Sequence, residues 1–271
     1  MRLLSFSAGL FSLSLAGCTG TSDSGPVDSA DADTDTDADS DTDTDTDTDE
    51  QEGTATISGS IRAYDGSTPS DVEIQACVTT CFSSTTDATG AFSFTGMDAG
   101  EYKVDVVGEG VDGKDYGRMR VQGIVDDGGA WVSPGALFMP QMFGPTSINS
   151  SGTFTFGAVS WTVDPSILTI PFGYDAGMYS VGVVDGAEIG PFWSVTPSLA
   201  VAFGPLATEV AGSFDITVST DVPAGQYDVY SVGLHGDLEG PVGTGTASGT
   251  SLTATGLTPE LLTWLLFVPQ S

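Results

Sequence analysis

Cysteine and histidine, which often supply nucleophiles and metal ligands, are scarce in this chain of 271 residues. The sequence contains three cysteines, Cys18, Cys77 and Cys81, and one histidine, His235. It lacks the local patterns of a zinc protease, a serine hydrolase and a phosphate-binding loop. We interpret His235, within Leu-His-Gly-Asp, as a surface-loop residue. The sequence therefore predicts a protein that is not an enzyme, with no catalytic residues, no cofactor and no metal site.

Carboxylates are the chemically active groups that remain, with 37 Asp and Glu against six Lys and Arg and a net charge of −31. Two paired carboxylates can hydrolyse glycosides, but sequence spacing singles out no such pair. No Lys or Arg follows Arg120. Because such a chain cannot neutralise phosphates, nucleic acid is excluded as a partner. Electrostatic binding to anionic lipid headgroups is excluded for the same reason.

The first 17 residues have the pattern of a secretory signal peptide, with Arg2 before a short apolar run and small residues before a cleavage point. The run is too short and too rich in serine for a transmembrane helix. Two interpretations are open: a lipoprotein signal, described next, and an ordinary signal peptide that happens to be followed by a cysteine.

The segment Leu15-Ala16-Gly17-Cys18 resembles the lipobox of bacterial lipoproteins. The resemblance implies cleavage after Gly17, a diacylglyceryl group on the Cys18 thiol and acylation of the new amine. A residue other than Asp after the cysteine, here Thr19, favours export to the outer membrane. The expected location is therefore the cell outer membrane, lipid-anchored, facing either the surface or the periplasm.

Residues 18–53 are predicted to be a disordered acidic linker. Asp alternates with Thr, Ala or Ser from Asp31 to Asp49, so like charges repel and no apolar core can form. A flexible chain of this length spans on the order of 30 Å. A calcium loop is the alternative, but Thr44 stands where an EF-hand needs Gly, and no helices flank it. The carboxylates that fall at the ligand positions of such a calcium loop are Asp39, Asp41, Asp43, Asp45, Asp47 and Glu50.

From Thr54 the sequence alternates apolar and polar residues between turn signals, which predicts β-strands. Gly59-x-Ile61, residues 86–94 (Thr-Asp-Ala-Thr-Gly-Ala-Phe-Ser-Phe) and residues 96–104 (Gly-Met-Asp-Ala-Gly-Glu-Tyr-Lys-Val) resemble the carboxypeptidase regulatory-like family. The likeness covers residues 54–110. It implies a small prealbumin-like β-sandwich, which is grouped with carbohydrate-binding-like folds and is not itself a peptidase.

Cys77 and Cys81 are predicted to form a disulfide. On a straight strand they would lie about 13 Å apart, which is too far to bridge. If residues 78–80 form a tight hairpin loop, the two cysteines face one another, and export to an oxidising compartment favours the bond. The alternative, a metal site, lacks ligands because His235 is far along the chain.

The pattern Ala-Gly-x-Tyr-x-Val-x-x-Val occurs three times, beginning at Ala99, Ala176 and Ala224. In Greek-key sandwiches a tyrosine in such a position can pin a loop with its hydroxyl while its ring packs inward. The pattern therefore predicts a structural role for its tyrosines, which are Tyr102, Tyr179 and Tyr227.

The predicted fold is all-β, with two β-sandwich domains. Residues 111–143 are expected to be a connecting β/loop segment, and residues 144–271 a second β-sandwich. The strands expected there are residues 152–156, 159–163, 167–170, 199–203, 214–218, 252–255 and 262–268.

Two functional hypotheses follow. The first is a non-catalytic envelope lipoprotein that displays β-sandwich modules for structural or adhesive roles, with surface proteins or polysaccharide as partners. The second is a carbohydrate-binding lipoprotein in which Trp131 and Trp193, beside turns, stack on sugar rings. Trp161 and Trp264 lie in apolar strands and are expected in the core. Exposed coplanar aromatic rings would favour glycan binding, and buried indoles would favour the structural role.

Overall fold

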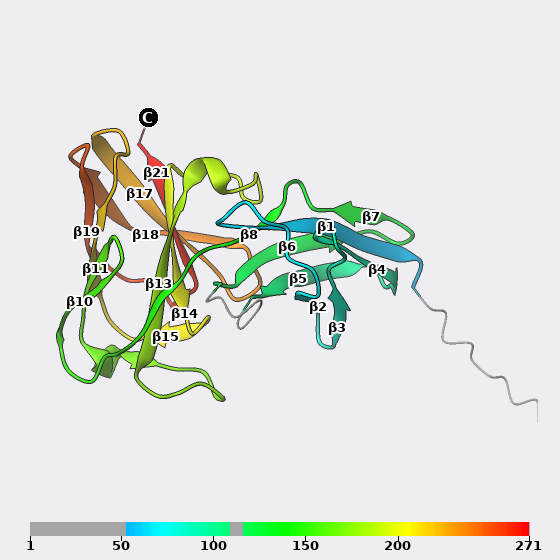
Figure 1. Ribbon diagram of the computed structural model, residues 1–271, viewed down its shortest axis with the longest axis horizontal. Helices are drawn as coiled ribbons and strands as arrows, with labels where there is room; N and C mark the ends of the chain where they lie inside the picture. Colours follow the sequence, from blue (N-terminus) through cyan, green and yellow to red (C-terminus); the bar gives the residue numbers. More distant parts are fainter. Residues whose placement is uncertain (1–52, 109–115, 271) are drawn as a thin grey trace, which may run out of the picture. The chain divides into compact units, whose positions relative to one another are not determined.

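The computed structural model describes residues 53–108 and 116–270, and its strands are shown in Figure 1. In these residues every regular element is a β-strand except two short 3₁₀ turns, η2 (Pro165–Ile167) and η3 (Gly186–Glu188). The predicted all-β class is therefore confirmed. No helix in this part of the chain is long and apolar enough to cross a membrane. The expected signal peptide, Cys18 and the linker up to residue 52 lie outside the described residues.

The N-terminal lobe, defined here as strands β1 to β8, consists of two facing sheets. The four-stranded antiparallel sheet has the order β3 (Cys81–Thr85), β2 (Glu73–Cys77), β5 (Gly100–Val107) and β6 (Met119–Val125). The other sheet has the order β4 (Ala91–Met97), β1 (Ala55–Ala63) and β7 (Ala130–Val132), and β8 (Leu137–Met139) also pairs with β1. Alternate side chains, including Ile57, Ile74 and Val104, are fully buried between the sheets. The lobe is therefore a β-sandwich.

Residues 111–143 were expected to connect the domains, and their described part, from residue 116, supplies β6, β7 and β8 to this lobe. Strand β6 pairs antiparallel with β5, whereas β7 and β8 run parallel to β1. All three side chains of β8 are buried. Burial of its apolar side chains stabilises β8 as a strand of the lobe.

The C-terminal lobe, strands β9 to β21, is built mainly on one ten-stranded sheet. Its strands in spatial order are β10 (Gly152–Phe156), β11 (Val159–Val163), β16 (Phe214–Ser219), β19 (Ser251–Leu257), β18 (Leu238–Ala247), β17 (Gly225–Val232), β21 (Trp264–Pro269), β14 (Leu199–Gly204), β13 (Met178–Asp185) and β9 (Phe143–Ser147). A small sheet is formed by β12 (Leu168–Thr169), β15 (Thr208–Val210) and β20 (Leu261–Leu262).

Trp161 shows how the long sheet closes around a core. It lies in β11 near one end of the sheet, yet its ring centroid is 5.5 Å from that of Tyr179 in β13 and 5.3 Å from that of Phe203 in β14, near the other end. The sheet therefore folds over, and its two halves face each other as in a sandwich. Trp161 and Trp264 are both buried, as predicted.

The repeated tyrosines have the structural role expected of them in two of the three copies. The Tyr102 hydroxyl donates to the carbonyl oxygen of Asp98 at 3.0 Å, and the Tyr227 hydroxyl donates to that of Pro223 at 2.8 Å. Both rings are buried. Each tyrosine thus ties the loop before its strand to the core. In the remaining copy, Tyr179 packs its ring against Trp161, and burial raises the pKa of its hydroxyl.

The predicted disulfide is present. Strands β2 and β3 form a hairpin in which Cys77 and Cys81 are directly opposite residues. The Val78 N–H donates to the Thr80 carbonyl at the turn, and the two sulfur atoms are bonded at 2.05 Å. The tight loop assumed from the sequence therefore exists.

The two lobes share an apolar core. In β14, Leu199, Val201 and Phe203 face the interior of the C-terminal lobe, whereas Ala200 and Ala202 face the cluster that fills the N-terminal lobe. The side chains of strand β21 also face these two clusters alternately. Because both faces of these strands are buried, their sequences are continuously apolar rather than alternating.

Candidate functional site

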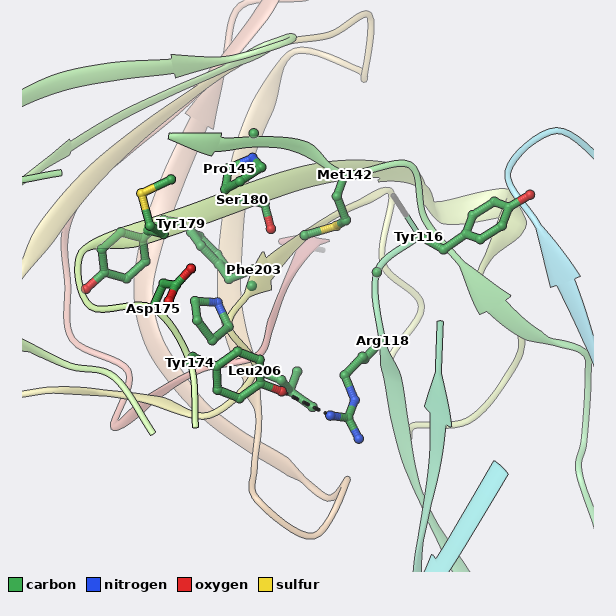
Figure 2. A pocket seen from close by; sticks show the side chains of 15 residues that line it. Tyr116, Arg118, Met142, Pro145, Tyr174, Asp175, Tyr179, Ser180, Phe203 and Leu206 are labelled. Atoms are coloured by element: carbon green, nitrogen blue, oxygen red, sulfur yellow. Dashed lines mark hydrogen bonds between the residues drawn. The ribbon is translucent and has the colours of Figure 1, made fainter. Parts of the chain in front are cut away.

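A pocket of about 370 Å³ lies where the two lobes meet (Figure 2). Residues from the segment before β6 line one side, and residues of the β12–β13 loop, β13 and the end of β14 line the other. This volume falls in the range of small-molecule sites, about 300–1,000 Å³. The residues used below are Arg118, Tyr174, Asp175, Tyr179, Ser180 and Phe203.

Arg118 is held at the pocket by contacts to both lobes. One Nη atom donates to the Asp105 carboxylate at 3.0 Å, and the other donates to the Tyr174 hydroxyl at 3.2 Å, as the dashed line in Figure 2 marks. Its backbone carbonyl accepts a hydrogen bond from the buried Trp264 indole N–H at 2.8 Å. Both the backbone and the guanidinium of Arg118 are therefore positioned without a ligand.

Asp105 is the carboxylate that joins Arg118 to a second arginine, Arg120. It is only 1% exposed, and its Oδ2 atom also accepts from Arg120 at 2.7 Å, across the β5–β6 pair. Asp105 and Arg120 lie on the sheet face opposite the buried Val104, because successive side chains alternate along a strand. On the same face, burial and then the nearby Arg120 charge lower the pKa of Lys103.

Three of the four basic residues in the described part of the chain make contacts where the lobes meet. Arg62 forms an ion pair with Glu188, Arg118 contacts Tyr174, and the Arg120 guanidinium donates to the Leu234 carbonyl at 3.0 Å. Each of these partners belongs to the C-terminal lobe, whose sequence contains no Lys or Arg. The basic residues of one lobe therefore bind polar and acidic groups of the other.

The loop between β12 and β13 brings two polar groups to the pocket. Gly173 and Gly177 have φ values of 99° and 76°, which L-amino acids with a side chain rarely adopt. The turn between these glycines places Tyr174 and Asp175 on the pocket wall, and Tyr174 remains 38% exposed. This loop leads directly into the copy of the repeat that contains Tyr179.

The pocket floor is apolar and closely packed. The Phe203 and Tyr179 rings form part of it and belong to the core around Trp161. Met142 packs against Gly117 and Gly182, where an added Cβ would lie 2.6 Å and 2.9 Å from its sulfur. Larger side chains at these glycines would displace Met142, so the shape of the floor depends on them.

The pocket combines apolar lining residues with a few polar groups. Arg118 and the Tyr174 hydroxyl offer donors, Asp175 offers an acceptor, and Ser180 offers a hydroxyl that does both. Asp175 is the carboxylate among the described residues that line it. Such a surface can bind a small ligand that has an apolar face and several hydroxyl groups.

The two tryptophans proposed for glycan stacking lie outside this pocket and are half-buried. The Trp131 ring covers Gly123, where an added Cβ would lie 3.2 Å from the ring. The Trp193 indole N–H donates to the Gly236 carbonyl at 2.9 Å. Both rings also pack against the core of the N-terminal lobe. The structure assigns them packing roles, and stacking on a sugar at Trp131 or Trp193 stays a prediction.

His235 lies on an exposed loop, as expected, and borders a smaller pocket of about 280 Å³. Lys103 and Cys77 also line this hollow. Within residues 53–108 and 116–270, no group of three or more His, Cys, Asp or Glu side chains is placed to hold a metal ion.

Sequence reasoning missed Arg118, Tyr174 and Asp175. Two signals pointed to them: Arg118 is one of only six basic residues, and Tyr174-Asp175 immediately precedes a copy of the repeat. Neither signal shows that these positions meet, because 56 residues separate Arg118 from Tyr174.

No protein-family model and no curated protein matches the sequence. The resemblance to the carboxypeptidase regulatory-like family therefore stays a prediction. Among solved structures, the chain is similar to a protein from Bacteroides uniformis that has been proposed to bind carbohydrate, with 12% identity, 80% of each chain covered and a TM-score of 0.26. A similarity at this TM-score carries no argument about this protein.

Proposed function

We propose that the protein is a non-catalytic, lipid-anchored envelope protein that binds carbohydrate in the pocket between its lobes. The observation that carries the proposal is the Arg118–Tyr174 hydrogen bond, which joins two sides of the pocket. A site that is organised before the ligand arrives loses less conformational entropy on binding.

The chemistry of the pocket favours a sugar over other small ligands. A sugar ring has apolar C–H faces that can pack on the partly exposed Tyr174 ring, and its hydroxyls can pair with Arg118, Tyr174 and Asp175. Phosphate-rich ligands are disfavoured by the net charge of −31. Glycosidases use two carboxylates, and among the described residues that line this pocket the carboxylate is Asp175.

We expect Tyr174→Ala to weaken glycan binding by at least about tenfold, because the variant removes both a ring from the wall and the partner of Arg118. The full chain would be screened against polysaccharides and envelope glycans, with and without calcium. The strongest ligands would then be titrated by calorimetry. Phe82→Ala is the matched control, since Phe82 is 41% exposed and lies outside the pocket.

The screen also separates the other hypotheses. Binding that survives Tyr174→Ala but is lost on replacing Trp131 or Trp193 would move the site to those tryptophans. If no glycan binds the wild-type chain, the carbohydrate proposal is wrong. A structural or adhesive role with surface proteins as partners would then be the better explanation.

The proposed anchor makes a separate prediction. Cys18→Ser should move the protein from the membrane fraction to the soluble fraction, because stable attachment needs two or more acyl chains and the variant removes their attachment point. Fractionation and immunoblotting measure this. Thr19→Asp is the matched control, which we expect to stay membrane-bound but to leave the outer membrane. Unchanged membrane partitioning of Cys18→Ser would rule out the anchor.

A further inference from the structure

Phe172 is fully exposed at the tip of the loop between β12 and β13. The next residue, Gly173, has a positive φ, and an added Cβ there would meet no atom within 4 Å. Phe172 is two residues before Tyr174, which lines the pocket. The loop therefore holds an aromatic ring in solvent beside the pocket.

This exposure sets Phe172 apart from the other phenylalanines of the described chain. Seven of them are buried, and the two others counted among the exposed large apolar residues, Phe82 and Phe143, are only 41% and 37% exposed. Burial of an aromatic side chain is one of the larger apolar contributions available to a protein. A ring that folding leaves uncovered can still contribute this free energy when a ligand covers it.

The charge of the surroundings restricts what can cover Phe172. The loop contains Asp175, the C-terminal lobe contains no Lys or Arg, and Arg118, which contacts Tyr174 of this loop, is also hydrogen-bonded to the Asp105 carboxylate. Anionic lipid and nucleic acid would therefore be repelled from this loop. An uncharged glycan chain is compatible with the charge, and its ring faces can stack on phenylalanine.

We propose that Phe172 forms a second sugar-binding subsite at the rim of the pocket, so that the protein binds an uncharged oligosaccharide chain rather than a single sugar. This inference rests on the proposed carbohydrate function. One sugar occupies the pocket against Arg118 and Tyr174, and a following sugar of the same chain stacks on Phe172.

The test is the dependence of affinity on oligosaccharide length. The full chain would be titrated with glucose, N-acetylglucosamine and xylose and with the cello-, chito- and xylo-oligosaccharides of two to six residues. We expect the longer members of one series to bind about tenfold more tightly than its single sugar. Phe172→Ala should abolish this gain and leave single-sugar binding unchanged, whereas Phe172→Trp and the control Phe82→Ala should keep it.

Three results would overturn the inference. Affinity that does not increase with chain length, or a gain that survives Phe172→Ala, would leave the pocket as the sugar site but eliminate the second subsite. Absence of binding to every sugar in the three series, for the wild-type chain and all variants, would overturn the subsite and count against the carbohydrate function as well.

Discussion

Replacing Asp105 with alanine is expected to lower the free energy of unfolding by about 3–5 kcal/mol. The Asp105 carboxylate is buried and accepts hydrogen bonds from both Arg118 and Arg120. Its removal leaves two positive charges close together in a poorly hydrated environment, where their repulsion is weakly screened. Urea denaturation of the full chain, followed by tryptophan fluorescence, measures the loss.

A double-mutant cycle distinguishes the broken charge pair from a simple packing defect. Asp105→Leu combined with Arg120→Leu should lose less stability than the sum of the two single variants, because the pair is removed together. A loss below about 1 kcal/mol for Asp105→Ala would instead indicate a pair that behaves like an exposed salt bridge. In that case the contact between the lobes would not depend on this cluster.

Replacing Trp161 with alanine is expected to cost about 3–5 kcal/mol, the range for removing a large buried aromatic side chain. Trp161 is fully buried, and its ring contacts the rings of Phe156, Tyr179, Phe203 and Phe214. These rings come from both halves of the folded ten-stranded sheet, so the cavity would open at its centre. Thermal or urea unfolding measures the change.

Trp161→Phe is the matched control for this prediction. It keeps an aromatic ring in the core and removes the indole N–H, which has no hydrogen-bond partner among the described residues. We therefore expect a much smaller loss than for alanine, because no buried polar atom is left unpaired. Equal losses for the two variants would show that the site does not tolerate any change of shape.

Much of the strand architecture follows from the sequence alone. Strands β10 and β11 occupy the residues predicted for them, 152–156 and 159–163. The period of two along a strand and the turn residues between strands are local properties, so they can be read without knowing the fold. The Cys77–Cys81 pair and the pinning hydroxyls of Tyr102 and Tyr227 are also local, since each joins residues four apart.

Much less of the candidate site could be predicted from the sequence. Trp131 and Trp193 lie beside turn residues and are half-buried, with both rings packed on the core of the N-terminal lobe, and sugar stacking on them stays a prediction. Sequence shows that a side chain is near a turn, whereas its exposure depends on which distant elements pack over it. Arg118 and Tyr174 become a site only because the two lobes meet at that point.

The sequence by itself determined the strands, the hairpin disulfide, the all-β class and the absence of basic residues after Arg120. Only the tertiary structure decided that β14 and β21 are buried on both faces, and that three of the arginines contact the C-terminal lobe. The physical reason is the separation along the chain over which each interaction acts. Backbone geometry and side-chain alternation act over a few residues, whereas the contact between the lobes depends on shape and charge at positions far apart in the chain.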